Sequence, residues 1–379
     1  MRILHVTPGI NPASGGPTRS VKGLCRGLAK AGVDVSLLVM REQQEFENPC
    51  GVKVIYGMQN LKGGFAAYDL VHFHGLWDLD LHRAIVRCRA EKVRYLISPR
   101  GMLDPWALSV KKWKKRLGMF LYQGQDLKRA AAFHVTAELE VTSVRRAGFS
   151  QPCIISPNGV DVPDERMFEC SECSNALVGE GRTAIFLSRL HPGKGLLLLA
   201  EAWARVRPQG WRMLVVGPDV CGHKAEVLAK LDAFGISYVD ATACTQSNIR
   251  TFEQSNNSSW QFVDMVDDVA KWKYYRSADL LVHPSVSENF GITIAEGLAA
   301  GLPVICTDGT PWTDVRDFKC GWYIKANSID ALTAALQEAT ASSNLDEMGS
   351  RGRKLVEDRY SWAAACDKMV RGYKEIVRG

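Results

Sequence analysis

The 379-residue sequence has no long hydrophobic segment and no leader-like start. A membrane-spanning helix needs roughly 18–20 consecutive apolar residues, and no run approaches that length. The first ten residues, MRILHVTPGI, lack the long apolar stretch and the small-residue cleavage site of a signal peptide. These absences argue against an integral membrane protein and a secreted one, and we expect a cytoplasmic protein.

Regular cysteine spacing is also missing. The 11 cysteines are odd in number and scattered, which argues against a disulfide framework. Only Cys170 and Cys173 have C-x-x-C spacing. Cys221 and His223 could complete a zinc set, but no second pair at zinc-finger spacing exists. We therefore predict that the protein needs no metal and no cofactor, and that its cysteines are reduced, buried thiols.

Acidic residues are scarce in the first part of the chain. Residues 1–160 contain 23 Lys and Arg against 12 Asp and Glu, an excess of 11 positive charges, whereas the remainder has 24 against 29. A basic half joined to an acidic half suggests an anionic partner, such as a membrane surface, a phosphorylated acceptor or nucleic acid; an uneven, solvated surface explains the same counts. We predict no nucleic-acid partner, because the basic residues are not interleaved with an RNA- or DNA-binding motif.

The chain does contain a regular alternation of short apolar runs with helical or turn stretches. This alternation predicts an α/β protein with parallel sheets, and it occurs twice, which predicts two Rossmann-like, doubly wound domains. The polar, acidic segment 162–181 has little periodicity, so we place the junction there, with domains at 1–162 and 163–361 and a last helix over 362–379. The apolar runs are 2–7, 35–40, 52–56, 70–74, 95–98, 132–136, 153–156, 184–187, 213–216, 262–266, 280–283 and 303–306.

Ligand sites of parallel sheets lie at the carboxyl ends of strands, where helix N-termini present free amides. The first strand runs into a loop with adjacent glycines, Gly15 and Gly16. They would let the backbone approach a phosphate closely, although Gly-Gly-Pro is also an ordinary turn. Polar side chains stand at three further strand ends, and we expect them to converge: His72, His74, Arg100, Thr136 and Glu138.

The stretch 285–308, SVSENFGITIAEGLAAGLPVICTD, has Glu288 in a loop after a strand and Glu296 eight residues later in a helix. Carboxylates accept hydrogen bonds from vicinal hydroxyls, so the pair suits a hexose and a ribose. Arg189 and Lys194, in SRLHPGKG, offer two cations around two glycines and suit a diphosphate; a solvated loop is the alternative. Together these groups describe a nucleotide sugar.

A basic, aromatic segment lies between Asp104 and Arg129, with Lys111–Arg116 around Trp113. One interpretation is a helix that lies on an anionic membrane surface, which would place the protein peripherally on the inner face of the plasma membrane. The other is a solvated helix with its apolar face packed on the sheet. The sequence fits both.

The pattern E-N-F-G-x-x-x-x-E-G from Glu288, with G-x-P-V behind it and S-R-L-x-x-x-K-G before it, resembles the E-x7-E signature of glycosyltransferase family 4. The Gly-Gly loop, HFHG at 72–75, PNGVD at 157–161 and the Ser-Trp pair at 361–362 fall where that family places them. PRGMLDPWAL and TPW at 310–312 look like a bacterial subgroup that builds exopolysaccharide or O-antigen-type chains. The resemblance implies retaining enzymes of the GT-B fold, with two Rossmann-like domains facing a deep cleft and the last helix packed back toward the N-terminal domain.

The resemblance also implies roles at the matching positions. Glu288 would hold hydroxyls of the transferred sugar, and Glu296 the hydroxyls of the ribose. The residues expected to meet the donor phosphates, the sugar or, through the Met265 backbone, the base are Gly15, Gly16, Arg189, Lys194, Met265, Asn289, Phe290, Gly291 and Ile292. The departing phosphate would accept the proton of the attacking hydroxyl on the same face of the sugar; Glu288 as a covalent nucleophile is the alternative.

Two positions of this chain depart from the family pattern, and a third matches a motif of another fold. Asp264 stands where the family usually has Gly, which weakens the expected contact with the base. Many members have a donor-contacting His where this chain has Arg100, and either Arg100 or His74 is expected to take over its role. Asp78-Leu79-Asp80 matches D-x-D, the metal motif of the other glycosyltransferase fold, but it opens an apparent helix, so we interpret it as helix-start acids.

We therefore expect an enzyme, a retaining hexosyltransferase. It would move a hexose, with glucose as the best guess, from a UDP-sugar to a growing polysaccharide or lipid-linked glycan. The alternatives within the fold are a 2-epimerase and a transferase to a soluble sugar phosphate. The alternative outside enzymes is a non-catalytic protein that binds nucleotide sugars.

Overall fold

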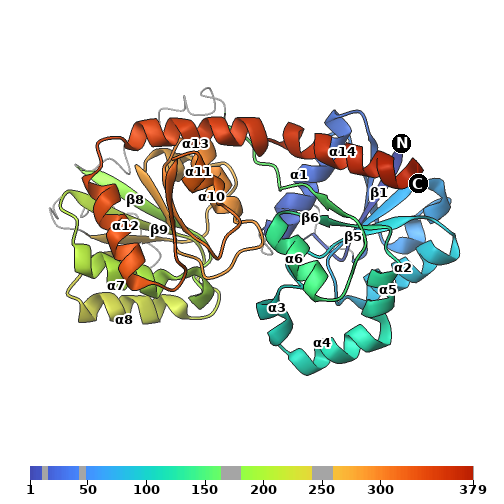
Figure 1. The fold of residues 1–379 in the computed structure, drawn as a ribbon, viewed down its shortest axis with the longest axis horizontal. Helices are drawn as coiled ribbons and strands as arrows, with labels where there is room; N and C mark the ends of the chain where they lie inside the picture. The colour runs from blue at the N-terminus through green and yellow to red at the C-terminus, as the bar shows by residue number, and fades with distance from the viewer. Residues whose placement is uncertain (11–15, 42–47, 164–180, 241–258, 379) are drawn as a thin grey trace. The chain divides into compact units, whose positions relative to one another are not determined.

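The structure, a computed structural model, describes residues 1–10, 16–41, 48–163, 181–240 and 259–378. Gly15 and the Cys170–Cys173 pair lie outside these residues. The chain divides into two compact units, Met1–Val160 with Arg359–Gly379, and Asp161–Asp358. Each unit is built on one parallel sheet with helices on both faces (Figure 1).

The N-terminal unit has a seven-stranded sheet in the order β3-β2-β1-β4-β5-β6-β7. The order reverses beside β1, so the chain winds first to one side of that strand and then to the other, as in doubly wound folds. The strands are β1 (Arg2–Thr7), β2 (Asp34–Val39), β3 (Lys53–Tyr56), β4 (Leu70–His74), β5 (Tyr95–Ser98), β6 (Ala132–Val135) and β7 (Cys153–Ile155).

The C-terminal unit repeats this architecture in the order β10-β11-β9-β8-β12-β13-β14. Its chain reversal lies beside β8, and the strand next to it, β12, leads into the Glu288 loop. The strands are β8 (Arg182–Leu187), β9 (Trp211–Val216), β10 (Tyr238–Asp240), β11 (Trp260–Val263), β12 (Leu280–His283), β13 (Val304–Thr307) and β14 (Gly321–Ile324).

The helices of both units fall between these strands. In the N-terminal unit they are α1 (Gly16–Lys30), α2 (Leu79–Ala90), α3 (Pro105–Ser109), α4 (Lys112–Gly118), the π-helical turn η4 (Met119–Gln123), α5 (Gly124–Lys128), α6 (Glu138–Arg146) and α14 (Trp362–Arg378). In the C-terminal unit they are α7 (Leu196–Val206), α8 (His223–Ala233), α9 (Ala270–Arg276), α10 (Ile292–Ala299), α11 (Asp314–Asp317), α12 (Ile329–Ala341) and α13 (Leu345–Arg359). Short 3-10 turns occur at η2 (Met58–Asn60), η3 (Phe65–Ala67) and η7 (Pro192–Lys194).

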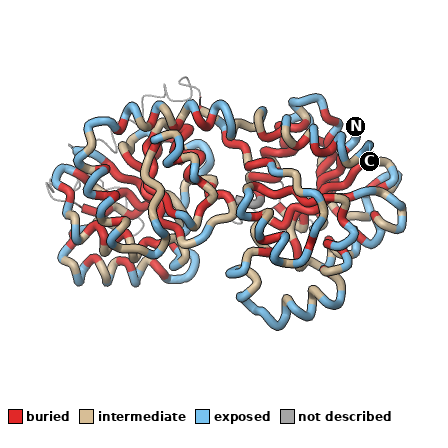
Figure 2. The backbone as a smooth tube through the Cα atoms, in the orientation of Figure 1, coloured by how far each residue is buried: buried red, intermediate tan, exposed pale blue. Residues whose placement is uncertain are grey.

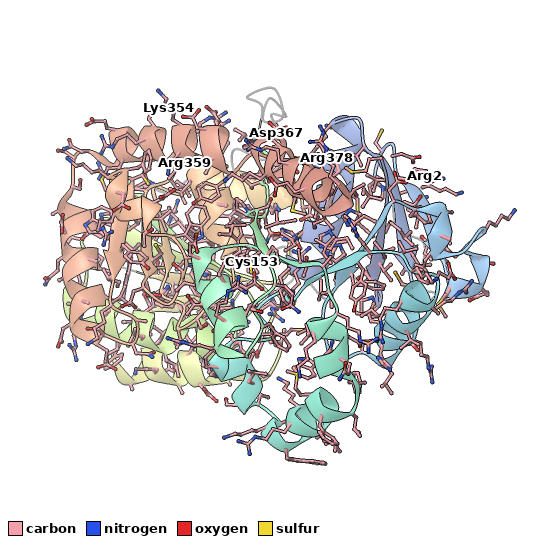
Figure 3. The ribbon with its side chains drawn as sticks, turned by 45° about the vertical axis from the view of Figure 1, so that its right-hand side comes forward. Arg2, Cys153, Lys354, Arg359, Asp367 and Arg378 are labelled. Carbon is pink, nitrogen blue, oxygen red and sulfur yellow. The ribbon has the colours of Figure 1, made fainter. Side chains whose placement is uncertain are left out.

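The central strands are buried on both faces, which explains why they read as continuous apolar runs rather than alternating ones (Figure 2). The last helix, α14, belongs to the N-terminal core, where Met369 and Tyr373 pack with residues of α1. Two glycines make room for its first residue. A Cβ on Gly23 would come within 2.0 Å of the Trp362 ring, and one on Gly159 within 2.4 Å. Figure 3 labels Asp367 and Arg378 along this helix and Cys153 on the edge strand β7.

The predicted fold class is confirmed, and two details of the sheets differ from expectation. Strands β10 and β14 are short edge strands that the apolar runs do not reveal, since their residues are only half-buried. Strand β11 begins at Trp260, two positions before the apolar run predicted at 262–266, and ends at Val263. Among the described residues, no helix is both long and apolar enough to cross a membrane.

Candidate functional site

The loop between β12 and α10 places Glu288 at the carboxyl end of a central strand. Gly291 has φ +78, in the left-handed region that favours glycine, and turns the chain into α10. No side chain of the described residues caps that helix. Ile294 donates its amide to the Gly291 carbonyl at 2.9 Å, whereas the amides of Ile292 and Thr293 remain available to an anionic ligand. The loop floor is fixed by Trp312, whose buried indole nitrogen donates to the carbonyl oxygen of Phe290 at 2.6 Å.

Three donors converge on one oxygen of Glu288. Lys194 forms an ion pair with Oε1, and His283 Nε2 and the Ser285 hydroxyl lie 3.0 Å from the same atom. The second oxygen, Oε2, accepts no hydrogen bond from the described residues. Because one oxygen is fixed by protein donors, the other is positioned to accept from a ligand hydroxyl.

The same neighbours keep this carboxylate ionised. Burial alone would raise the pKa of Glu288, but the hydrogen bond from His283 and the charge of Lys194 outweigh burial and hold the pKa below its ordinary value. Lys194 reaches Glu288 because η7 is seated against the same loop. Val286 donates its amide to the Gly193 carbonyl at 3.0 Å, and a Cβ on Gly195 would come within 2.2 Å of the Pro284 carbonyl oxygen.

Glu296 lies on the buried side of α10 and has its own partners. Lys271, on α9, donates to Oε1 at 2.6 Å, and the Tyr275 hydroxyl donates to Oε2 at 3.1 Å. Both side chains of the ion pair are less than a tenth exposed. Each carboxylate oxygen has a second acceptor site, so this arrangement fixes the direction of Glu296 without filling its capacity to accept hydroxyls.

Other residues of the predicted donor site are less firmly held. Arg189 is exposed and forms no hydrogen bond or ion pair with the described residues. The amide of Met265 donates to the Asp264 carboxylate at 2.7 Å, so only the Met265 carbonyl remains for a base. The Met265 amide is occupied because this chain has Asp264 where the family usually has Gly. A glycine at position 264 has no carboxylate and would leave the amide free.

Arg100 is the central polar group of the N-terminal unit. It follows β5 with φ +56, a left-handed conformation that costs energy for a residue with a Cβ and that concentrates at functional sites. One guanidinium nitrogen donates to the Ser20 hydroxyl at 2.9 Å and the Asn158 side-chain oxygen at 3.1 Å; the other donates to His74 Nδ1 at 3.0 Å. The Nε hydrogen is buried and has no hydrogen-bond partner among the described residues.

Glu140 holds the backbone around Arg100, and sequence reasoning missed it. Its two oxygens accept from the amide of Gly101 at 2.7 Å and the amide of Thr136 at 2.8 Å, which ties the loop after β5 to the end of β6. The residue predicted from the sequence was Glu138, which begins α6 and is exposed. Helical spacing could have favoured Glu140, since it shares the buried side of α6 with Val144.

The predicted convergence occurs for His72, His74 and Arg100, with two additional histidines, whereas the predicted Glu138 is exposed. His72 and His74 of β4 lie beside His5 of β1 and His134 of β6, all almost completely buried. One nitrogen from each of His5, His72 and His74 lies within 4.8 Å of the others, a spacing that could suit a metal ion. Every ring nitrogen of these three already has a hydrogen-bond partner, so a metal would have to displace existing bonds.

The D-x-D sequence serves as a helix start, as predicted. The Asp78 side chain accepts from the amides of Asp80 and Leu81, at 2.9 and 3.2 Å, and so caps α2. Arg41 pairs with both aspartates, at 3.2 Å from Asp80. These contacts account for both carboxylates without a metal.

Comparison with known proteins covers both halves of the chain. Residues 14–163 match the family described as Glycosyltransferase Family 4, and residues 172–355 match the family described as Glycosyl transferases group 1. Phosphatidyl-myo-inositol mannosyltransferase of Mycobacterium tuberculosis is 27% identical over 235 residues, 58% of this chain and 53% of that protein. The chain therefore spans about half the length of the curated relatives it matches.

Solved structures match over the entire chain at low sequence identity. Sucrose-phosphate synthase from Thermosynechococcus elongatus has a TM-score of 0.74 at 18% identity, covering 100% of both chains. Anabaena HepE in complex with UDP has a TM-score of 0.74 at 14% identity, covering 99% of this chain and 100% of its own. At such identities the likeness establishes the fold.

Proposed function

Because the chain belongs to the glycosyltransferases of the group 1 and family 4 type, with the two Rossmann-like domains of the GT-B fold, we propose that it is a retaining hexosyltransferase. Its donor is a UDP-hexose, with UDP-glucose as the first choice, and its acceptor is a growing polysaccharide or a lipid-linked glycan. The proposal assigns it no metal and no cofactor.

The observation that carries this proposal is the environment of Glu288. An ionised carboxylate with one fixed oxygen and one available oxygen suits hydroxyls of a sugar, and it stands next to the uncapped start of α10, which suits a phosphate. Lys194 is close enough to share its charge between Glu288 and that phosphate. The exposed Arg189 supplies a second cation for the same diphosphate.

In the proposed reaction the bond between the anomeric carbon and the diphosphate oxygen breaks, and the diphosphate leaves with the electron pair. The acceptor hydroxyl attacks the anomeric carbon from the same face, and its proton passes to the departing phosphate oxygen. Negative charge grows on the diphosphate, where Lys194, Arg189 and the amides of 289–292 stabilise it. Glu288 holds hydroxyls of the sugar throughout, and Glu296 holds those of the ribose. Gly16, in the first turn of α1, adds a backbone approach to the phosphates.

The names of related proteins support the choice of donor and acceptor. HepE is solved with UDP, with UDP and glucose, and with UDP-glucose, and the mycobacterial relative is named for mannosyl transfer to phosphatidyl-myo-inositol. These names favour a uridine donor and a lipid-linked acceptor. Sucrose-phosphate synthase, whose name denotes a sugar phosphate product, supports the second candidate, a transferase to a soluble sugar phosphate.

A screen of UDP-, GDP- and ADP-hexoses for hydrolysis tests the proposal. We expect a UDP-hexose to be hydrolysed at least about tenfold faster than the others, since discrimination by hydrogen-bonding sites is steep. NMR of the released sugar should show the donor's anomeric configuration first. Binding without turnover would identify a non-catalytic protein, and turnover that requires a soluble hexose phosphate would identify the second candidate. Inverted sugar would contradict the retaining mechanism.

We also propose that the segment 105–121 rests on an anionic membrane surface at the inner face of the plasma membrane. The interpretation in which its apolar side chains pack on the sheet does not fit the structure, because Trp113 is 67% exposed and Phe120 is 84% exposed. Trp106, Leu117 and Leu121 are exposed as well. Cations and apolar rings on one short stretch suit the interfacial region of a membrane.

Vesicle binding should therefore depend on the lysines of α4. Changing Lys111, Lys112 and Lys114 to Gln is expected to lower the partition coefficient on phosphatidylserine-containing vesicles by roughly a hundredfold, at about 1 kcal/mol for each lysine near such a surface. Co-sedimentation with the vesicles measures this partition coefficient. The control changes three exposed lysines elsewhere in the same unit, Lys30, Lys53 and Lys62. Equal losses of vesicle binding in both triple variants would mean that binding depends on net charge and not on the segment 105–121.

A further inference from the structure

An unbroken series of hydrogen bonds runs from Arg100 through the sheet of the N-terminal unit to the last helix and back. We call it the relay. Its members, in order, are Arg100, His74, His5, Tyr373, His72, Ser98, His134 and the carbonyl oxygen of Ser156. The successive donor–acceptor distances are 3.0, 2.9, 3.4, 2.6, 2.6, 2.8 and 3.0 Å.

The Arg100 end of the relay allows only one direction of donation. A guanidinium can donate but never accept, so His74 Nδ1 must be the acceptor. A neutral imidazole has one donor and one acceptor nitrogen, so His74 Nε2 carries the hydrogen and donates to His5 Nδ1. By the same reasoning His5 Nε2 donates to the Tyr373 hydroxyl, which donates onward to His72 Nδ1.

The Ser156 end gives the same direction independently. A backbone carbonyl can only accept, so His134 Nε2 donates to it and His134 Nδ1 accepts from the Ser98 hydroxyl. That hydroxyl in turn accepts from His72 Nε2, which leaves His72 Nδ1 as the acceptor from Tyr373. Both ends therefore require the Nε2–H tautomer at all four histidines.

The burial of the imidazoles is consistent with neutral rings. Burial is the main cause that lowers the pKa of His5 and of His134 to about 3. Burial also holds the pKa values of His72 and His74 well below the ordinary value, and neighbouring histidines and the Arg100 charge add to the lowering. Arg100 is the one cation of the series. Glu140, the closest carboxylate to influence it, is bonded to backbone amides rather than to the guanidinium.

We propose that the relay is a positioning device that presets the Arg100 guanidinium for an anionic oxygen of the substrate. The relay, with Ser20 and Asn158, uses three of the five hydrogens of Arg100, and the buried Nε hydrogen has no partner among the described residues. A half-buried cation with a buried, unbonded Nε donor and no hydrogen-bonded carboxylate among the described residues suits a phosphate or sulfate oxygen. His74, His5, Tyr373, His72, Ser98 and His134 act through Arg100 and touch no substrate.

The relay also makes α14 part of this site. Tyr373 is the only member outside the sheet strands and their connecting loops, and its hydroxyl is the link between the His5 side and the His72 side of the relay. Without that hydroxyl, His5 Nε2–H loses its acceptor. The His5 tautomer is then held from the His74 side alone, so Tyr373 no longer opposes the other tautomer, which would place two donors face to face between His5 and His74 or between His74 and Arg100. The orientation of Arg100 is no longer unique.

The tautomers can be measured without any substrate. Long-range ¹H–¹⁵N correlation spectra of the ¹⁵N-histidine-labelled protein at pH 7 should show four buried imidazoles with protonated Nε2 and unprotonated Nδ1, assigned with single His→Gln variants. A charged imidazole, or an Nδ1–H tautomer at any of the four, would overturn the relay. The tautomer measurement does not depend on the proposed function. The role of Arg100 toward the substrate does rest on the proposed function.

The functional arm compares two tyrosines of the same unit. Tyr373→Phe keeps the ring and removes the linking hydroxyl, whereas Tyr95→Phe removes a buried hydroxyl that donates to the Asp126 carbonyl at 2.8 Å, outside the relay. For Tyr373→Phe we expect kcat for UDP-glucose hydrolysis to fall about tenfold or more with KM almost unchanged, because a misplaced charged group chiefly affects the transition state. The His72 and His5 signals should show mixed tautomers.

Ser98→Ala, which cuts the relay at another link, provides the second variant should Tyr373→Phe fold poorly. Equal kcat values in Tyr95→Phe and both relay variants would overturn the positioning role. Wild-type tautomers in Tyr373→Phe and Ser98→Ala would do the same. If no nucleotide sugar is turned over but all four tautomers are as expected, the proposed function fails while the relay stands.

Discussion

Replacement of Lys194 by alanine is expected to slow donor turnover by about 10²–10³-fold, the loss typical when one preorganised donor to a developing negative charge is removed. Lys194 pairs with Glu288, and no other lysine or arginine among the described residues contacts that carboxylate. The substitution removes the cation that we propose meets the departing diphosphate and also the partner that helps to keep Glu288 ionised. The rate constant for UDP-glucose hydrolysis measures the effect.

The matched control is Lys230→Ala, which deletes a lysine from another lysine–carboxylate pair of the same unit. Lys230 donates to Glu201 at 2.8 Å, and both side chains are about a quarter exposed, so the pair contributes roughly 1 kcal/mol or less. Lys194→Arg should restore part of the rate, since the charge returns with a different shape. A near-normal rate in Lys194→Ala would exclude the residue from the chemistry.

The strands that form the two sheets are largely predictable because a parallel strand buried on both faces is a short continuous apolar run. Leu70–His74 and Leu280–His283 were predicted with the bounds that the structure has. Half-buried edge strands such as β10 and β14 give no such run, since solvent covers one side. Their placement depends on pairing with β11 and β13, which is set by contacts far apart in the sequence.

Glu288 and Glu296 could be chosen from sequence because their spacing places one in a loop and the other in the following helix. Their partners could not. His283 ends the preceding strand as an unremarkable polar residue, and Lys271 lies on α9, 25 positions before Glu296. A lysine buried beside a glutamate has no local sequence signal, because burial is decided by how the helices pack.

The relay could not be predicted from the sequence either, although some of its members were predicted. His72, His74 and Arg100 were expected to converge, but His5 and His134 are single histidines within apolar strands, which normally indicates a structural residue. Tyr373 comes from the other end of the chain, 301 positions from His72. The series of hydrogen bonds is continuous only because α14 packs on the first sheet. The fixed orientation of the Arg100 guanidinium therefore depends on the topology of the fold and has no sequence motif.

Glu296→Ala should reduce both the stability of the C-terminal unit and its affinity for a nucleotide. The Glu296–Lys271 pair is buried, and removing one partner leaves an uncompensated charge, which typically costs about 3 kcal/mol or more of the free energy of unfolding. Asp268 lies 3.2 Å from Lys271 but is 61% exposed, so it compensates only weakly. Urea unfolding measures the loss of stability, and calorimetry with UDP measures the loss of affinity.

A double variant separates these two effects. In Lys271→Met with Glu296→Gln no buried charge is left unpaired, and replacing a buried ion pair by neutral groups of similar volume is often neutral for stability. We therefore expect the double variant to unfold at nearly the wild-type urea concentration while UDP binding stays weak, because the carboxylate that we propose accepts the ribose hydroxyls is absent. Wild-type affinity in the double variant would contradict the ribose role of Glu296. An unchanged midpoint in Glu296→Ala would show instead that Lys271 finds another partner or reaches water.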